Sequence, residues 1–213
     1  MTGIHDLALF VAAGLLLNIT PGPDMAYIAA RGAAGGFRAG VAATLGITAG
    51  CVVHTLAAAA GLSVLLATSA AAFGVVKWCG AAYLLYAGIR LVAASARPPR
   101  EATGNVLVSP AAAPRIFREA FVINVLNPKV ALFFLAFLPQ FIDAGAPAKA
   151  LAFIALGCLF IFNSLFVNVP VAWLAARAGS RIRNHAQAAR WLTGAVGALF
   201  VLLAARLATL EKT

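Results

Sequence analysis

The chain has 213 residues, of which 63% are hydrophobic and only 10% are charged. A soluble domain carries roughly 25% charged residues, so this composition excludes a water-soluble globular protein and indicates an integral membrane protein. The net charge of +10 does not indicate a nucleic-acid-binding protein, because the basic residues lie in short segments between apolar stretches and the sequence carries no such binding motif.

Six apolar segments are each long enough to cross about 30 Å of hydrocarbon, which takes roughly 20 helical residues. In chain order they are residues 7–30, 39–66, 70–94, 116–142, 148–175 and 188–209. A proline-rich stretch at about 97–114 cannot continue a helix and predicts a linker. The sequence therefore predicts a single all-α membrane domain over residues 1–213, with three helices in each half (about 1–96 and 115–213).

The distribution of basic residues predicts the orientation in the membrane. Eleven Lys and Arg residues lie in or beside the first, third and fifth connections between segments, and four lie on the opposite side. Short loops rich in Lys and Arg stay in the cytoplasm. Both termini are therefore predicted to lie outside the cytoplasm.

Two of the six segments are interrupted at matching places. The first segment contains Asn18–Asp24 and the fourth contains Asn124–Lys129, and Pro21 and Pro128 are separated by half the chain. Because each half has an odd number of segments, the second half enters the membrane from the opposite side. We expect two inverted three-helix repeats, with proline-broken helices 1 and 4.

Proline within a helix removes one N–H donor and clashes with the carbonyl one turn earlier. In hydrocarbon, each freed backbone group costs several kcal/mol unless it finds a polar partner. Matched interruptions therefore favour a transport site, in which half-helix ends point at a ligand. The alternative is a pair of proline kinks that only shape helix packing.

An ionisable residue directly follows each interruption, Asp24 after the first and Lys129 after the second. Charges at membrane depth are costly and usually face a cavity or a partner. The two side chains either pair with each other or hold a zwitterion, with Asp24 on its ammonium and Lys129 on its carboxylate. A desolvated carboxylate also suits a proton carrier. The alternatives are a hydrated Asp24 near the cytoplasmic face and a Lys129 that snorkels to an interface.

Neutral polar side chains add further candidates. His54 is either a proton relay or substrate contact, or a buried histidine bonded to a carbonyl. Asn163 either lines the pathway or makes a helix–helix hydrogen bond, and Ser164, Asn168 and Pro170 beside it predict a third interrupted helix. The predicted substrate-binding or coupling residues are Asn18, Thr20, Pro21, Gly22, Pro23, Asp24, His54, Asn124, Asn127, Pro128, Lys129 and Asn163.

Several functional classes lack the residues they need. Aspartyl proteolysis needs two carboxylates, and Asp24 is the only acid at the interruptions; no Ser/His pair or nucleotide-binding loop is present. The three cysteines are unpaired in sequence, so no metal site or cofactor is predicted. The chain is not expected to be an enzyme.

With these residues in view, the chain resembles the LysE/RhtB family of bacterial amino-acid exporters over essentially its whole length. The resemblance rests on Thr20–Asp24, the Gly-rich second segment up to His54, Lys77–Leu84, Asn124–Lys129, Phe133-Phe134 and Leu138–Phe141. It implies secondary active export of amino acids across a bacterial inner membrane, driven by the proton motive force, and a homo-oligomer.

The substrate class is narrowed only slightly by the residues themselves. A cationic amino-acid side chain would need its own acid, and the interruptions offer none beyond Asp24. A small neutral amino acid, of the threonine, homoserine or leucine type, is therefore favoured over lysine or arginine. The competing hypothesis is a metal or inorganic-ion exporter of related architecture.

Overall fold

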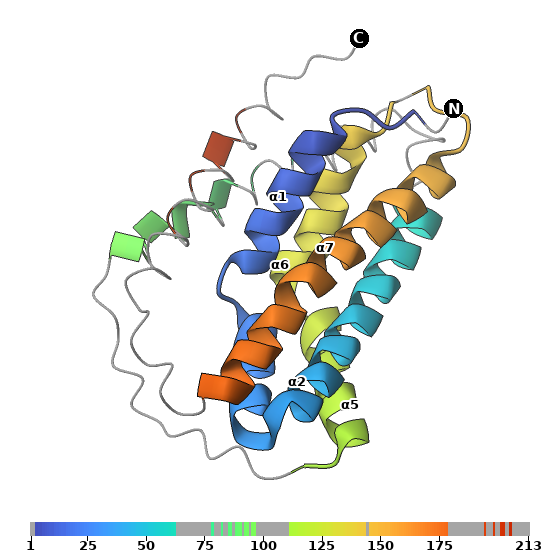
Figure 1. Ribbon diagram of the computed structural model, residues 1–213. Coiled ribbons are helices and arrows are strands. Elements are labelled where there is room, and N and C mark those ends of the chain that lie inside the picture. Colours follow the sequence, from blue (N-terminus) through green and yellow to red (C-terminus); the bar gives the residue numbers. More distant parts are fainter. Residues whose placement is uncertain are drawn as a thin grey trace.

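The computed structural model describes residues 3–62, 111–143 and 145–178, together with isolated positions between 78 and 96 and between 194 and 205. The continuous described stretches are helical, as an all-α membrane protein requires. Their α-helices are α1 (Leu7–Ile19), α2 (Pro23–Ala57), α5 (Ala113–Val125), α6 (Pro128–Leu132) and α7 (Lys149–Ala178) (Figure 1). A π-helix η1 (Ala58–Leu62) extends α2, whereas π-helix η2 (Phe133–Phe137) and 3-10 turn η3 (Leu138–Phe141) extend α6.

Helix α2 reverses its direction at Gly36. This residue has φ 74° and ψ −176°, a region of backbone space that is essentially restricted to glycine. A Cβ built on Gly40 would lie 3.3 Å from the Cα of Gly32, whereas eight residues of straight helix span about 12 Å. The two arms of α2 are therefore antiparallel, and they complete the first and second predicted segments.

The fourth predicted segment is a bent pair of helices. Ala113–Val125 and Pro128–Phe141 meet at 48°. Within the described residues, Pro23–Leu62 and Lys149–Arg177 are long and apolar enough to cross a membrane, and this bent pair counts as a third crossing. The third and sixth predicted segments and the linker at 97–114 lie mostly outside the described residues.

Helix α7 is continuous, so the predicted interruption of the fifth segment is wrong. Pro170 lies inside the helix and removes one backbone hydrogen bond. The turns before it are fixed by fully buried Phe153, Leu156 and Phe160, and the turns after it by Ala172, which packs against Gly32 and Gly40 of α2. Packing on both sides keeps the helix intact.

The two broken spans run antiparallel along their whole length. At one end Ile4 forms an antiparallel bridge with Ile142, and the ring of Phe10 lies 5.2 Å from that of Phe141. At the other end the Tyr27 hydroxyl donates to Glu119 Oε2 at 2.6 Å. This arrangement places α1 beside α6 and the first arm of α2 beside α5 (Figure 1).

Two different cores hold these helices together. Beside α1, the core is aromatic and comprises Phe10, Phe133, Phe134, Phe137, Phe141 and Phe160 with smaller neighbours. Beside α5, small residues allow close approach: a Cβ on Gly46 would overlap the Phe117 carbonyl of α5. The Gly46 face of the second segment therefore packs against a helix of its own chain.

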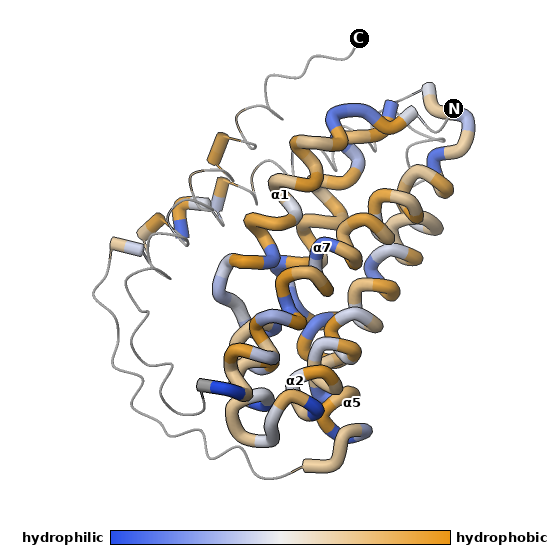
Figure 2. Tube along the Cα trace, viewed as in Figure 1, coloured by the Kyte–Doolittle hydropathy of each residue, from blue (hydrophilic) through white to orange (hydrophobic). Residues whose placement is uncertain are grey.

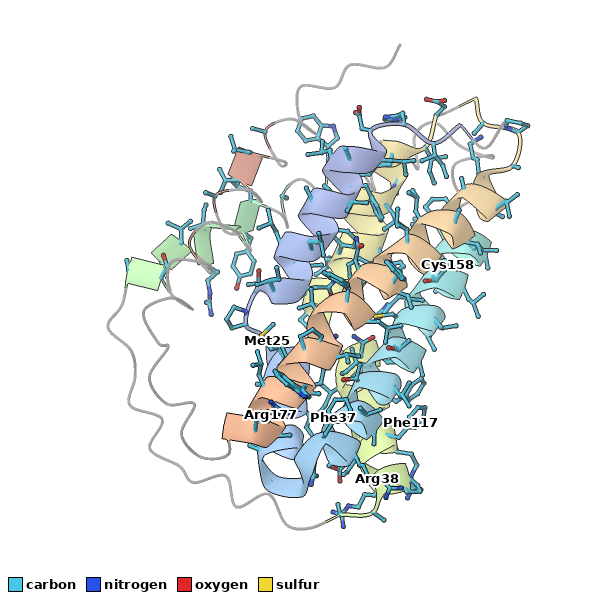
Figure 3. All side chains as sticks on the ribbon, in the orientation of Figure 1. Met25, Phe37, Arg38, Phe117, Cys158 and Arg177 are labelled. Carbon is cyan, nitrogen blue, oxygen red and sulfur yellow. The ribbon has the colours of Figure 1, made fainter. Side chains whose placement is uncertain are left out.

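Hydropathy follows the pattern expected for a protein in a bilayer. The helices are mainly apolar, and hydrophilic residues gather at their ends and at the level of the breaks (Figure 2). Large apolar side chains such as Leu126, Phe162 and Phe166 are at least 66% exposed, which is a cost in water and none in lipid. Arg38 and Arg177 lie at the same end of the bundle as Phe117 (Figure 3).

Candidate functional site

The first break separates α1 from α2. Helix α1 ends at Ile19, and Thr20 and Gly22 have extended backbones. The Thr20 hydroxyl donates to the Leu16 carbonyl at 2.6 Å. Pro23 then occupies the first position of α2, where a missing N–H costs nothing.

The second break separates α5 from α6 and has the same plan. Asn127 caps α6, because its Oδ1 accepts from the backbone N–H of Lys129 at 3.0 Å. Pro128 occupies the first helical position. The structural counterpart of Pro128 is therefore Pro23, whereas Pro21, which we paired with it on sequence, lies in the connecting segment. Asp24 and Lys129 both occupy the second position of the helix that follows.

The Lys129 ammonium reaches from the second break into the first. Its Nζ donates to the Leu17 carbonyl at 2.8 Å and to the Thr20 carbonyl at 3.1 Å. These carbonyls lie at the C-terminal end of α1, where a positive charge is favoured. Lys129 therefore satisfies backbone groups that the first break has exposed.

Asn124 connects three parts of the site. Its Nδ2 donates to Asp24 Oδ2 at 2.8 Å, and its carbonyl accepts from the Asn127 N–H at 2.9 Å. The same carbonyl lies 3.1 Å from His54 Nε2, so that nitrogen must carry the proton. His54 thus makes the carbonyl bond that was one of its two expected roles, and its ring stacks on Phe134 at 5.7 Å.

Asp24 and Lys129 do not form an ion pair in the described part of the chain. Lys129 is bound to carbonyls of α1, and Asp24 is bound to Asn124. Each charge is held by neutral groups rather than by the opposite charge.

Three buried polar atoms at the breaks have no partner among the described residues. They are Asp24 Oδ1, Asn124 Oδ1 and Asn127 Nδ2. An unsatisfied buried group costs about 1–3 kcal/mol, and such groups in native structures call for a specific explanation. Two acceptors and one donor, beside an ammonium, match the needs of a ligand that carries both charges.

Asn18 and Asn163 are not brought to the breaks. Asn18 Nδ2 donates to the Gly14 carbonyl of its own helix at 2.9 Å. Asn163 Nδ2 lies 3.5 Å from the Val11 carbonyl, which corresponds to the helix–helix contact that was one of its two expected roles. Asn163 therefore lies between α1 and α7, whereas Asn18 binds its own helix.

Sequence reasoning missed a second polar cluster, at the end of the bundle beyond Asp24. Arg31 Nη2 forms an ion pair with Glu119 Oε2 at 2.6 Å, and Tyr27 donates to the same oxygen. Arg115 Nε donates to Glu119 Oε1 at 2.9 Å. The four-residue spacing of Arg115 and Glu119 is a recognisable signal, but nothing in the sequence indicates the long-range partners Tyr27 and Arg31.

Comparison with known proteins places the chain in a family. A profile of the LysE type translocator matches residues 15–211. The chain belongs to the LysE type translocator family. It is accordingly a multi-pass membrane protein, and the family's members are transporters.

Individual relatives cover nearly the whole chain. Proteins named leucine efflux protein are 28% identical over 210 residues in Salmonella typhimurium and 29% identical over 211 residues in Klebsiella pneumoniae, covering 99% of this chain and 98% of the relative in both cases. An uncharacterized membrane protein, PA4757, of Pseudomonas aeruginosa is 30% identical over 213 residues, covering 97% of this chain and 96% of that protein. No solved structure matches the chain.

Proposed function

We propose that the protein exports a small neutral amino acid of the leucine type across the bacterial inner membrane in exchange for protons. One observation carries the proposal: the two helix breaks lie side by side and present an ammonium, a carboxylate and unpartnered neutral groups at one place. Full-length relatives named for leucine efflux support this substrate class.

The geometry favours a defined orientation of the substrate. Asp24 Oδ1 is an unpartnered acceptor and suits the α-ammonium group. Asn127 Nδ2 is an unpartnered donor and, with the Lys129 ammonium, suits the α-carboxylate. The charge of the bound zwitterion is then balanced without a further acid, so a neutral side chain fits better than lysine or arginine.

Proton coupling is assigned to Asp24. Its carboxylate is partly buried and holds a single described hydrogen bond, from Asn124. Protonation would remove the charge that attracts the substrate ammonium and would favour release. This links the release of substrate to uptake of a proton from the outer compartment.

Other features of the proposal rest on the sequence alone. They are the position of both termini outside the cytoplasm, the inverted repeats at about 1–96 and 115–213, and a homo-oligomer. The antiparallel course of the two broken spans supports the inverted repeats. Nothing in the comparisons supports the alternative of a metal or inorganic-ion exporter.

The test uses purified protein in proteoliposomes loaded with a mixture of radiolabelled amino acids. An imposed pH gradient is expected to drive selective efflux of leucine or another small neutral amino acid. A proton conductor, which collapses the gradient, should abolish this gradient-driven efflux. Flux of lysine and arginine without neutral amino acids would contradict the substrate class. Flux that ignores the pH gradient would contradict the coupling.

A further inference from the structure

The Lys129 ammonium occupies a place that would otherwise suit a free cation. Two backbone carbonyls, of Leu17 and Thr20, converge on Nζ at 2.8 and 3.1 Å. Carbonyls exposed at the broken ends of membrane helices commonly coordinate cations. A lysine is a compact charge on a flexible four-carbon stem, so its ammonium can enter and leave such a place without moving the backbone.

Gly22 indicates that the space around these carbonyls is kept open. Its φ of −159° and ψ of −179° are extended and available to any residue, so the backbone does not demand glycine here. A Cβ at this position would lie 3.3 Å from Lys129 Nζ and 3.9 Å from Lys129 Cε, which is tighter than most such contacts. The glycine therefore provides room for an ammonium group.

The Asp24 carboxylate interacts electrostatically with the Lys129 ammonium. Asp24, two residues after Gly22, has its Oδ1 buried and unpartnered. Two carbonyls therefore bind the Lys129 ammonium directly, and Asp24 offers a carboxylate oxygen that no described group fills.

We propose that the Leu17 and Thr20 carbonyls, together with Asp24 Oδ1, form an ammonium site that Lys129 fills while no substrate is bound. On binding, the substrate's α-ammonium takes over this site, and the displaced Lys129 ammonium binds the substrate's carboxylate. The inference deepens the proposed function and rests on it for the identity of the substrate. No bond is formed or broken, and the net charge of the site is unchanged by the exchange.

The exchange gives Lys129 two acceptors in turn. In the empty protein, the Lys129 ammonium binds the carbonyls at the end of α1. When the substrate's ammonium replaces it there, the Lys129 ammonium binds the substrate's carboxylate instead. A ligand that lacks an ammonium group leaves Lys129 on its carbonyls and finds no positive partner. The site thereby selects for amino acids over simple carboxylic acids.

The experiment measures thermal unfolding of the purified full-length protein with methylammonium chloride, using tetramethylammonium chloride at equal ionic strength as the control. Tetramethylammonium has the same charge but no N–H donor. Lys129→Ala empties the site, whereas Lys129→Met keeps a side chain of similar length in it. A saturable rise in Tm with methylammonium is expected for Lys129→Ala only, and Gly22→Ala added to Lys129→Ala should weaken that binding about tenfold or more.

Absence of a rise in Lys129→Ala, an equal rise in wild type, or an equal effect of tetramethylammonium would overturn the site. If Lys129→Ala denatures on extraction, its recovery in folded form should increase with methylammonium present throughout; equal recovery with both salts would count against the site. These measurements test the ammonium site without transport. The proposed function is tested separately, because it would be refuted by the absence of leucine flux in the wild-type protein.

The exchange itself is tested on wild-type protein with leucine and with 4-methylpentanoate, which lacks only the ammonium group. Leucine is expected to raise Tm, and 4-methylpentanoate is not, because it cannot displace Lys129. An equal rise with both ligands would show that Lys129 is already free to bind a carboxylate, and the exchange would be wrong.

Discussion

The two helix breaks share one plan but are satisfied in different ways. In the second break, Asn127 caps α6 with its own side chain, within two residues of the backbone group it binds. In the first break, no side chain caps the start of α2, and the carbonyls at the end of α1 depend on Lys129, 109 residues away from Thr20. The second break is locally complete, whereas the first is completed by the second.

This difference makes the conformation of the first break depend on the second. A locally capped break is stable whatever the rest of the chain does, because its partner is always near. A break completed from a distance holds its conformation only while the distant residue is in place. Movement of Lys129 therefore alters both breaks, and substitutions should affect the first break more than the second.

The largest effect is expected for Lys129→Met. It removes the ammonium that binds the Leu17 and Thr20 carbonyls and interacts with Asp24. The Thr20 carbonyl is left without a described partner, at a cost of about 1–3 kcal/mol. Leucine flux in proteoliposomes should fall by about 100-fold or more, with a clear loss of Tm. Lys149→Met, at the start of α7 and away from the breaks, is the matched control and should transport normally.

Asp24→Asn should abolish coupled transport while sparing the fold. The amide oxygen of the new side chain can still accept from Asn124 Nδ2, so the bond at 2.8 Å is retained, but the charge that binds ammonium and carries the proton is lost. The measurement is leucine flux at several imposed pH gradients. Full, gradient-driven flux by this variant would remove Asp24 from the mechanism.

Gly50→Ala tests the position of Asn124, which the two breaks share. A Cβ on Gly50 would overlap the Asn124 side chain, and such overpacking costs about 1–3 kcal/mol. Both Tm and flux should fall. Gly61→Ala adds the same methyl group where nothing lies within 4 Å and is expected to change neither; equal effects of the two substitutions would rule out a specific role for the Asn124 contact.

The smallest effect is expected for Asn127→Ala, because it affects only the locally capped break. Loss of an N-cap costs about 1 kcal/mol, so Tm should fall slightly. Loss of the unpartnered Nδ2 donor should raise the KM for leucine more than it lowers kcat. A loss of flux as large as that of Lys129→Met would contradict the expectation that the first break is more sensitive to substitution than the second.

The fold was largely predictable because composition and proline positions carry most of the information about a membrane chain. The all-α class, the first, second, fourth and fifth segments in the described residues and the two breaks all follow from apolar length and from the prolines, although Pro23 rather than Pro21 proved to be the counterpart of Pro128. The continuity of α7 did not follow, because a single proline removes one hydrogen bond and tertiary packing decides whether the helix continues.

The site was predictable in its residue types but not in its pairings. Asp24 and Lys129 are conspicuous as charges among apolar residues, yet the sequence suggests that opposite charges pair, whereas here each binds neutral groups. The long-range contact of Tyr27 and Arg31 with Glu119 depends on the antiparallel register of two spans. No short-range pattern encodes that register.

The reversal at Gly36 has a consequence for how the chain enters the bilayer. Without it, the 35 residues of α2 would form a rod of about 50 Å, much longer than the roughly 30 Å of hydrocarbon. Arg31 and Arg38 flank the reversal closely on either side. A single glycine therefore lets two crossings insert as one hairpin with Arg38 exposed at its tip, so a bulkier residue there should impair biogenesis before it impairs transport.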